Sequence, residues 1–426
     1  MVLPSGGGGA LPYHPPVKPP SAALGLLAAL LASCAAPPPS PPPPDEESMP
    51  PLNFALDLRT PAMRAREAVS EVMGRPVPAE AANPVIATRA EMEQALMEEL
   101  RPQVDMLHPG ASQAARDTLL RSTAQRSARS VIARYSPDRK RILFPPENLL
   151  PQMAALGLPT DRSTVREFAT LVLAHEMVHA LDDEAHGLGT LFRSAPDAEA
   201  LRALGMVVEG RAVHYARRAA SLLGIDESIA SILPAEKGEL TDYRARFLLT
   251  YREGAAFAAA LEARGIDGLA ERVLEDPPRR TSTVFHPERY GPSGEAAAPD
   301  LAAALRDAGF AGAEPASELD LRARWLPVLG EEETARAFAG WVAGAGLAGP
   351  EGSLSVSLDE TPAGALAWAA GLRRLHGMEP GASEWHGGDA GSVVILVEGR
   401  STASATGPDP AAARAVAGRA LAAAGK

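Results

Sequence analysis

The segment His175-Glu176-Met-Val-His179 limits the possible folds of this chain more than any other stretch. Its two histidines are four residues apart, so an α-helix places both imidazoles on one face, one turn apart. Two neutral imidazoles at that separation can bind one Zn²⁺ ion. Glu176 can reach a water at the metal without binding the ion itself. We therefore expect Glu176 to be a general base.

The residues before this segment indicate a buried helix. Positions 168–174 are almost wholly apolar. Thr164 followed by Glu167 has the pattern of a capping box, which would begin the helix about three turns before the histidines. The alternative is a helix with two surface histidines. The apolar setting disfavours it, because two histidines and a glutamate on a buried helix need partners, and a metal ion supplies one.

A catalytic zinc site uses a third protein ligand and keeps the fourth position open. A second helical pattern runs from about Asp197 to Leu223 and contains Glu209. The chain between His179 and Glu209 is long enough for a connection and an antiparallel return helix. Glu209 is the expected third ligand, by the carboxylate precedent in catalytic sites. His186 and His214 remain possible in its place.

Asp183 follows His179 by four residues and lies on the same face of the expected helix. It is the natural acceptor for the N–H of a metal-binding histidine. The alternative is a solvated carboxylate near the end of the helix.

These segments resemble a family of bacterial gluzincin-type zinc metallopeptidases, many of which are lipoproteins. The family motif HExxHAxxD matches residues 175–183, and its EGxA motif matches 209–212. A Y-x-x-G-x-x-F segment matches 251–257. Residues 277–290 are similar to the family's P-P-x-S-T-E-Q-x-x-H-P-x-x-Y segment, with one extra arginine and an apolar pair in place of the polar one. The resemblance implies a zincin-like fold and hydrolysis of peptide bonds.

His286 and Tyr290 lie in the last of these segments. An imidazole or a phenol near the zinc can stabilise the oxyanion of a tetrahedral intermediate. His286 is the expected second catalytic residue. The alternative for each is a hydrogen-bonded structural role.

Residues 1–33 have the pattern of a lipoprotein signal peptide. The apolar run Ala22 to Ala32 is too short to span a bilayer. It ends at Leu31-Ala-Ser-Cys34, which resembles a lipobox and implies cleavage before Cys34 and lipidation of its thiol. Residues 34–52 are rich in proline and predict an extended polyproline II tether. The alternative is a plain secretory signal with an incidental cysteine. Cys34 is the only cysteine, so neither a disulfide nor a thiolate metal site is expected.

A β-hairpin is expected at 131–144, because the Ser-Pro-Asp segment is good turn chemistry between apolar flanks. In zincin-type enzymes a sheet lies over the HExxH helix, and its edge strand pairs with an extended substrate. The alternative is a hairpin that only packs on the core.

Further helices are expected at 61–73, 88–101, 111–129, 241–263 and 266–275.

The fold class expected from these patterns is α+β. A mainly helical, zincin-like catalytic domain would cover 53–290, and a small α+β unit without a visible catalytic set would cover 301–426. In that unit the sequence predicts strands at 354–358 and 392–398 and helices at 361–375 and 408–424.

The net charge of −12 disfavours a nucleic-acid partner.

From the HExxH segment, the family resemblance and the lipobox-like segment we expect a zinc metallopeptidase of the bacterial cell envelope, on its periplasmic or extracellular face. Lipidated Cys34 would attach it to the lipid bilayer, and a peptide or protein would be its substrate. The alternative is a non-catalytic envelope scaffold lipoprotein that retains a zinc site. The presence of Glu176 beside both histidines favours the enzyme.

Overall fold

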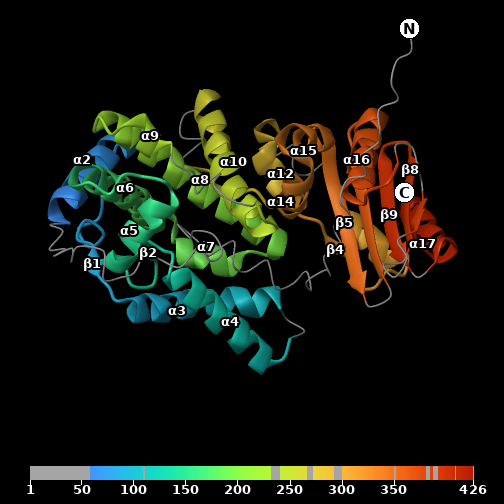
Figure 1. Cartoon of the computed structure of the whole chain (residues 1–426), viewed down its shortest axis with the longest axis horizontal. Coiled ribbons are helices and arrows are strands. Elements are labelled where there is room, and N and C mark those ends of the chain that lie inside the picture. Colours follow the sequence, from blue (N-terminus) through green and yellow to red (C-terminus); the bar gives the residue numbers. More distant parts are fainter. Residues whose placement is uncertain are drawn as a thin grey trace, which may run out of the picture.

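The computed structural model describes residues 58–108, 111–231, 240–265, 272–291, 300–349, 352–379, 384–386, 392–407 and 409–425. Helices make up most of this part of the chain and two sheets accompany them, so the fold is α+β. Figure 1 shows a helical body at one end and a six-stranded sheet at the other. The expected signal peptide, tether and Cys34 lie outside the described residues.

The helical body is built from successive helices and three short strands. In chain order these are α2 (Arg59–Met73), β1 (Val85–Ile86), α3 (Arg89–Leu107), α4 (Gln113–Ala128), β2 (Arg134–Ser136), β3 (Arg141–Phe144), α5 (Pro146–Ala155), α6 (Arg162–His186), α7 (Leu188–Ser194), α8 (Ala198–Leu222), α9 (Glu227–Ala230), α10 (Asp242–Ala263), α12 (Thr281–Phe285) and the 3-10 turn η2 (Pro287–Arg289). The predicted helices at 61–73, 88–101, 111–129 and 241–263 are present. Most of the predicted helix at 266–275 falls outside the described residues.

The predicted hairpin is confirmed. Strands β2 and β3 pair antiparallel, with Tyr135 opposite Ile142. Lys140 closes the turn with a positive φ of 52°. Strand β1 adds to β3 in parallel, so β2 remains an edge strand of a three-stranded sheet. Tyr135, Ile142 and Phe144 are buried in one core with the apolar residues of α6.

Helix α6 begins earlier than the sequence pattern predicts. Asp161 is its N-cap, and its carboxylate accepts hydrogen bonds from the backbone N–H groups of Ser163 and Thr164. The prediction that Thr164 caps the helix is therefore wrong. An ionised aspartate satisfies two free N–H groups at once, and it also accepts from the Thr164 hydroxyl at 2.6 Å. The helix ends at His186, and the C-cap Gly187 that follows has a φ of 67°, the left-handed conformation common after a helix.

Helices α8 and α10 pack unusually closely. A Cβ atom added to Gly210 would lie 2.0 Å from the carbonyl carbon of Gly254. One added to Gly254 would lie 2.1 Å from the carbonyl oxygen of Met206. Only residues without a side chain permit this approach, and α8 also packs against α6. Helix α8 begins after its N-cap Asp197, as predicted.

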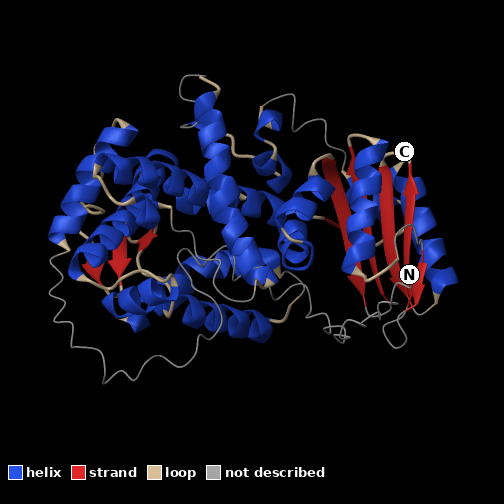
Figure 2. Ribbon diagram, turned by 45° about the horizontal axis from the view of Figure 1, so that its top comes forward, coloured by secondary structure: helices blue, strands red, loops and turns tan. Residues whose placement is uncertain are grey.

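The last part of the chain forms an antiparallel sheet with helices on both faces (Figure 2). Its strand order is β4-β5-β6-β9-β8-β7. One face packs on α13 and α17, and the other on α14, α15 and α16. The elements are α13 (Leu301–Asp307), β4 (Glu314–Pro315), α14 (Glu318–Leu329), α15 (Glu331–Phe338), β5 (Trp341–Gly349), β6 (Gly352–Asp359), α16 (Pro362–Leu375), β7 (Glu384–His386), β8 (Ser392–Glu398), β9 (Ser401–Gly407) and α17 (Pro410–Ala424).

The predicted strands at 354–358 and 392–398 and the predicted helices at 361–375 and 408–424 are all present, in β6, β8, α16 and α17. Strands β5 and β9 consist mostly of Gly, Ala, Ser and Thr, and the sequence pattern did not predict them. Helix α14 joins the two parts of the molecule. Its Leu319 and Leu326 pack against α10, and its Trp325 packs with the aromatic core under the sheet. Within the described residues, no helix has both the length and the apolar character needed to cross a bilayer.

Candidate metal centre

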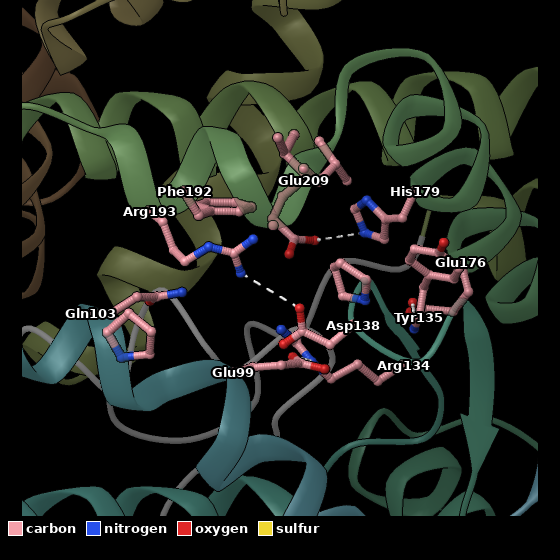
Figure 3. A pocket seen from close by; sticks show the side chains of 15 residues that line it. Glu99, Gln103, Arg134, Tyr135, Asp138, Glu176, His179, Phe192, Arg193 and Glu209 are labelled. Carbon is pink, nitrogen blue, oxygen red and sulfur yellow. Dashed lines mark hydrogen bonds and ion pairs between the residues drawn. The ribbon is translucent and has the colours of Figure 1, made fainter.

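Helix α6 places His175, Glu176 and His179 together in the buried interior, where this group could hold a metal ion. The two imidazole Nε2 atoms are 3.0 Å apart. Helix α8 brings a fourth group, because Glu209 Oε2 lies 3.2 Å from His175 Nε2 and 3.6 Å from His179 Nε2. Figure 3 shows the Glu209 carboxylate directed toward the His179 ring across the top of a cavity. The two helices therefore bring two imidazole nitrogens and one carboxylate oxygen to one point.

The neighbouring histidines favour the ionised form of the Glu209 carboxyl group. Burial alone would raise the pKa of its carboxyl group, but His179 and His175 outweigh that effect and hold the pKa well below its usual range. A carboxylate and two imidazoles are the donor types that bind borderline divalent metals.

Glu176 is fully buried and held by the edge strand. Its Oε2 accepts a hydrogen bond of 2.6 Å from the backbone N–H of Tyr135 on β2. Its Oε1 forms no hydrogen bond among the described residues. Burial raises the pKa of this carboxyl group to about 7, although the neighbouring His175 and the hydrogen bond from Tyr135 both lower it. Glu176 therefore combines a fixed orientation with one free oxygen.

A buried ion pair holds α6 and α8 in register beside the centre. Arg211 donates from Nε to Asp182 Oδ2 at 3.1 Å and from Nη2 to Asp182 Oδ1 at 2.9 Å. Both side chains are almost completely buried, and Arg75 adds a longer contact of 3.6 Å to Asp182. Sequence reasoning missed this pair. The signal for it is a pair of opposite charges on the two ligand-bearing helices, each within three residues of a proposed ligand.

Tyr251 is a second residue at the centre that the sequence did not assign. It lies on α10, is buried, and stacks on the His175 ring with ring centroids 6.1 Å apart. The close contact between Gly210 on α8 and Gly254 on α10 sets the position of Tyr251, because Tyr251 lies one turn before Gly254 on α10. The signal for Tyr251 is the Y-x-x-G spacing itself, which puts the tyrosine and the glycine toward the same neighbouring helix.

Asp183 does not accept a hydrogen bond from a histidine, contrary to the expectation. Its Oδ2 accepts from the Tyr135 hydroxyl at 2.7 Å and from Lys140 Nζ at 2.5 Å. Its Oδ1 and the Nδ1 atom of His179 are both buried, and neither forms a hydrogen bond among the described residues. The hairpin supplies both of these donors, so Asp183 joins the β2–β3 turn to α6.

His286 lies away from the metal-binding group. Its Nε2 is 3.4 Å from Glu318 Oε1 on α14, and its Nδ1 is 3.7 Å from Glu288. Helix α12, which precedes His286, contacts α8 near its start, where Thr281 donates to Glu199. Glu199 is ten residues before Glu209, or about 15 Å along the helix. The expected contact of His286 with the reaction centre is thus not found.

Tyr290 and His214 have hydrogen-bond partners outside the metal-binding group, and His186 lies at the end of α6. The Tyr290 hydroxyl donates to the carbonyl oxygen of Asp276. His214 Nε2 is 3.0 Å from Glu262 Oε2 on α10. His186 is the last residue of α6, two turns beyond His179.

A cavity opens beside Glu176, His179 and Glu209, between α3 on one side and α7 and α8 on the other (Figure 3). Its apolar wall is formed by Leu188, Phe192 and Val208. Neither His286 nor Tyr290 lines it. The candidate centre therefore borders this cavity on the side where α3 and β2 lie.

Arg134 is the more buried of the two arginines on the cavity wall. Its Nε donates to Glu99 Oε2 at 2.7 Å. Burial alone would lower the pKa of its guanidinium, but the charges of Glu99, Glu209 and Glu176 together raise it. Arg134 is therefore a permanent positive charge close to the candidate centre.

No protein-family model, no curated protein and no solved structure matches this chain. The chemistry of the site must be inferred from its own residues.

Proposed function

We propose that this protein is a zinc-dependent hydrolase that cleaves peptide bonds. His175, His179 and Glu209 would hold the zinc ion, and Glu176 would act as the general base. The observation that carries the proposal is the convergence of three ligand atoms, separated by 3.0, 3.2 and 3.6 Å, with a non-ligating carboxylate beside them.

The separations of the three ligand atoms support zinc. Bonds of about 2.0–2.2 Å in tetrahedral directions put ligand atoms about 3.4 Å apart. The separations found here lie on both sides of that value. Two histidines and a glutamate are also the ligand set of a catalytic rather than a structural zinc site.

The chain's own residues have distinct roles in this proposal. When bound, the ion supplies Lewis acidity and lowers the pKa of a water toward about 7. The Tyr135 N–H fixes one oxygen of Glu176, and the other oxygen takes the proton from the attacking water. Glu176 then returns that proton to the leaving amine. The buried Asp182–Arg211 pair keeps the α8 ligand aligned with the two on α6.

The position of the three-stranded sheet supports a zincin-like arrangement. Strand β2 is the edge strand next to α6, and its residues 134 and 135 line the cavity. An extended peptide lying along this edge would pass beside Glu176.

The proposed location is the bacterial cell envelope, with lipidated Cys34 as the membrane anchor and no nucleic-acid partner. The lipobox-like segment before Cys34 and the proline-rich tether support this. Cys34→Ser should move the protein from the detergent phase to the aqueous phase, or leave it unprocessed. Unchanged partitioning would refute the lipid anchor.

The test of the enzymatic proposal is Glu176→Gln. The variant should bind one zinc per chain, as the parent does, and should lose at least about a hundredfold in hydrolysis of a broad peptide library. Glutamine has the same size and can hydrogen-bond a water but cannot take a proton. Equal hydrolysis by both proteins would mean that the base is another residue. If the parent binds zinc and cleaves no member of the library, the scaffold interpretation replaces the enzyme.

A further inference from the structure

Arg134 has a position that the proposed chemistry does not use. It precedes Tyr135, the residue whose N–H holds Glu176, and successive side chains of a strand point to opposite faces. Tyr135 reaches toward Asp183, and Arg134 lies on the wall of the cavity facing α3 (Figure 3). Its side chain is 14% exposed.

Glu99 holds the Arg134 guanidinium through a hydrogen bond from its Nε atom. The contact at 2.7 Å uses Nε, and the Glu99 side chain is itself 8% exposed. Neither Nη1 nor Nη2 of Arg134 forms a hydrogen bond among the described residues. Two fixed nitrogen donors thus remain available at the cavity.

Arg193 on α7 provides a comparison within the same cavity. Its side chain is half exposed, and its contacts with Asp138 and Thr190 are both 3.5 Å long. It carries the same charge as Arg134 but is not held rigidly. A fixed guanidinium binds planar oxygen pairs better than a free one does, because less side-chain entropy is lost.

The charges of the cavity would not repel an anion. The two positive charges of a bound divalent ion would be balanced by the negative charges of Glu176 and Glu209. Arg134 is balanced by Glu99, and Arg193 by Asp138. An entering carboxylate would meet no net negative charge and would find two free donors on Arg134.

We propose that Arg134 binds a carboxylate of the substrate, so that the substrates are peptides with a carboxylate close to the scissile bond. This rests on the proposed function. A guanidinium and a carboxylate form two parallel charge-assisted hydrogen bonds, which are stronger than hydrogen bonds between neutral groups. The carboxylate comes either from the C-terminus of the peptide or from an Asp or Glu side chain.

A binding experiment tests this without hydrolysis. Zinc-loaded Glu176→Gln protein is immobilised and exposed to one peptide library made in two forms, with a free C-terminal acid and with a C-terminal amide. Retention of the acid form over the amide form identifies the terminal carboxylate. Enrichment of Asp and Glu over Asn and Gln in both forms identifies a side chain. Adding Arg134→Gln should remove whichever preference is seen, about ten- to a hundredfold.

Two further variants make the result specific. Arg134→Lys keeps the charge but not the paired donors, so it should retain only part of the preference. Arg193→Gln removes a charge from the same cavity and should keep the preference. Equal retention of both library forms without Asp or Glu enrichment overturns the proposal, and so does a preference that survives Arg134→Gln in protein of unchanged melting temperature.

Hydrolysis separates this inference from the proposed function. If the parent cleaves peptides and Arg134→Gln slows acidic and neutral peptides by the same factor, carboxylate recognition is wrong while the hydrolase stands. If the parent cleaves nothing yet the binding preference depends on Arg134, the hydrolase is wrong and the carboxylate site stands.

Discussion

Arg211 on α8 donates two hydrogen bonds, of 3.1 and 2.9 Å, to Asp182 on α6, and both side chains are almost completely buried. Asp182 follows His179 by three residues, and Arg211 follows Glu209 by two. The pair therefore ties together the two helices that carry the proposed ligands, within one turn of those ligands. Its planar fork geometry also limits rotation of one helix against the other.

Breaking this pair should cost both stability and metal affinity. Asp182→Ala leaves the buried Arg211 charge without its main partner, which typically costs about 3–5 kcal/mol. Denaturant unfolding measures the change, and chelator competition measures the zinc affinity. Glu332→Ala, which removes the exposed pair with Arg336, is the control and should change the unfolding free energy by less than about 0.5 kcal/mol. A loss as small as that in Asp182→Ala would show that the pair does not hold the helices.

Glu209→Gln should weaken zinc binding by at least about a hundredfold, because it replaces an anionic ligand with a neutral amide. His214→Ala and His186→Ala should leave the affinity unchanged, since one histidine contacts Glu262 and the other ends α6. Competition with a chromophoric chelator gives all three affinities. A histidine variant as damaging as Glu209→Gln would contradict the assignment of the third ligand.

Gly210→Ala should be strongly destabilising, although alanine normally favours a helix. The new methyl group would lie 2.0 Å from the Gly254 backbone, so α8 and α10 must separate. Overpacking of this kind costs about 1–3 kcal/mol or more, and it would also displace Glu209. Gly418→Ala in α17 is the matched control, because no atom lies within 4 Å of the added Cβ. That change should stabilise by about 0.5–1 kcal/mol. Thermal unfolding of both variants tests the contrast.

Asp359 should make folding stability depend on pH. It is fully buried at the end of β6, and neither carboxylate oxygen forms a hydrogen bond among the described residues. Burial, and then the charges of Glu318 and Glu360, raise its pKa from 3.8 to about 7. The folded protein thus binds a proton that the unfolded chain releases. This contribution to stability is complete below pH 3.8 and is lost as the pH rises to about 7.

Asp359→Asn should consequently stabilise the protein above pH 7, by an amount on the order of a few kcal/mol, and change it little near pH 4. Unfolding free energies of parent and variant between about pH 4 and pH 8 give the comparison. Parallel pH profiles would rule out Asp359 as the titrating group.

The local elements of the fold follow from local sequence patterns. The Ser-Pro-Asp turn between apolar flanks predicts the β2–β3 hairpin, and the alternation at 354–358 predicts β6. Strands β5 and β9 are different, because their Gly, Ala and Ser residues have weak strand preference and pair only where the neighbouring strands and helices bury them. The start of α6 differs from its prediction for a similar reason. Asp161 and Thr164 are both good capping residues, and only the folded backbone decides between them.

By itself the sequence determined that His175, Glu176 and His179 share one helix. The four-residue spacing of the histidines and their apolar setting both predict a buried helix with the two imidazoles on one face. The sequence also predicted Glu209, on a return helix, as the third ligand, with His186 and His214 as alternatives. Only the tertiary structure decided which distant groups face these four. Tyr251, Arg211 and Arg134 come from other elements, and their approach depends on a glycine contact, a buried ion pair and an edge strand. The tertiary structure likewise placed His286 beside Glu318 and Asp183 beside Tyr135. Contacts between residues far apart in the chain depend on how several packed surfaces fit at once, and a motif one element long does not contain that information.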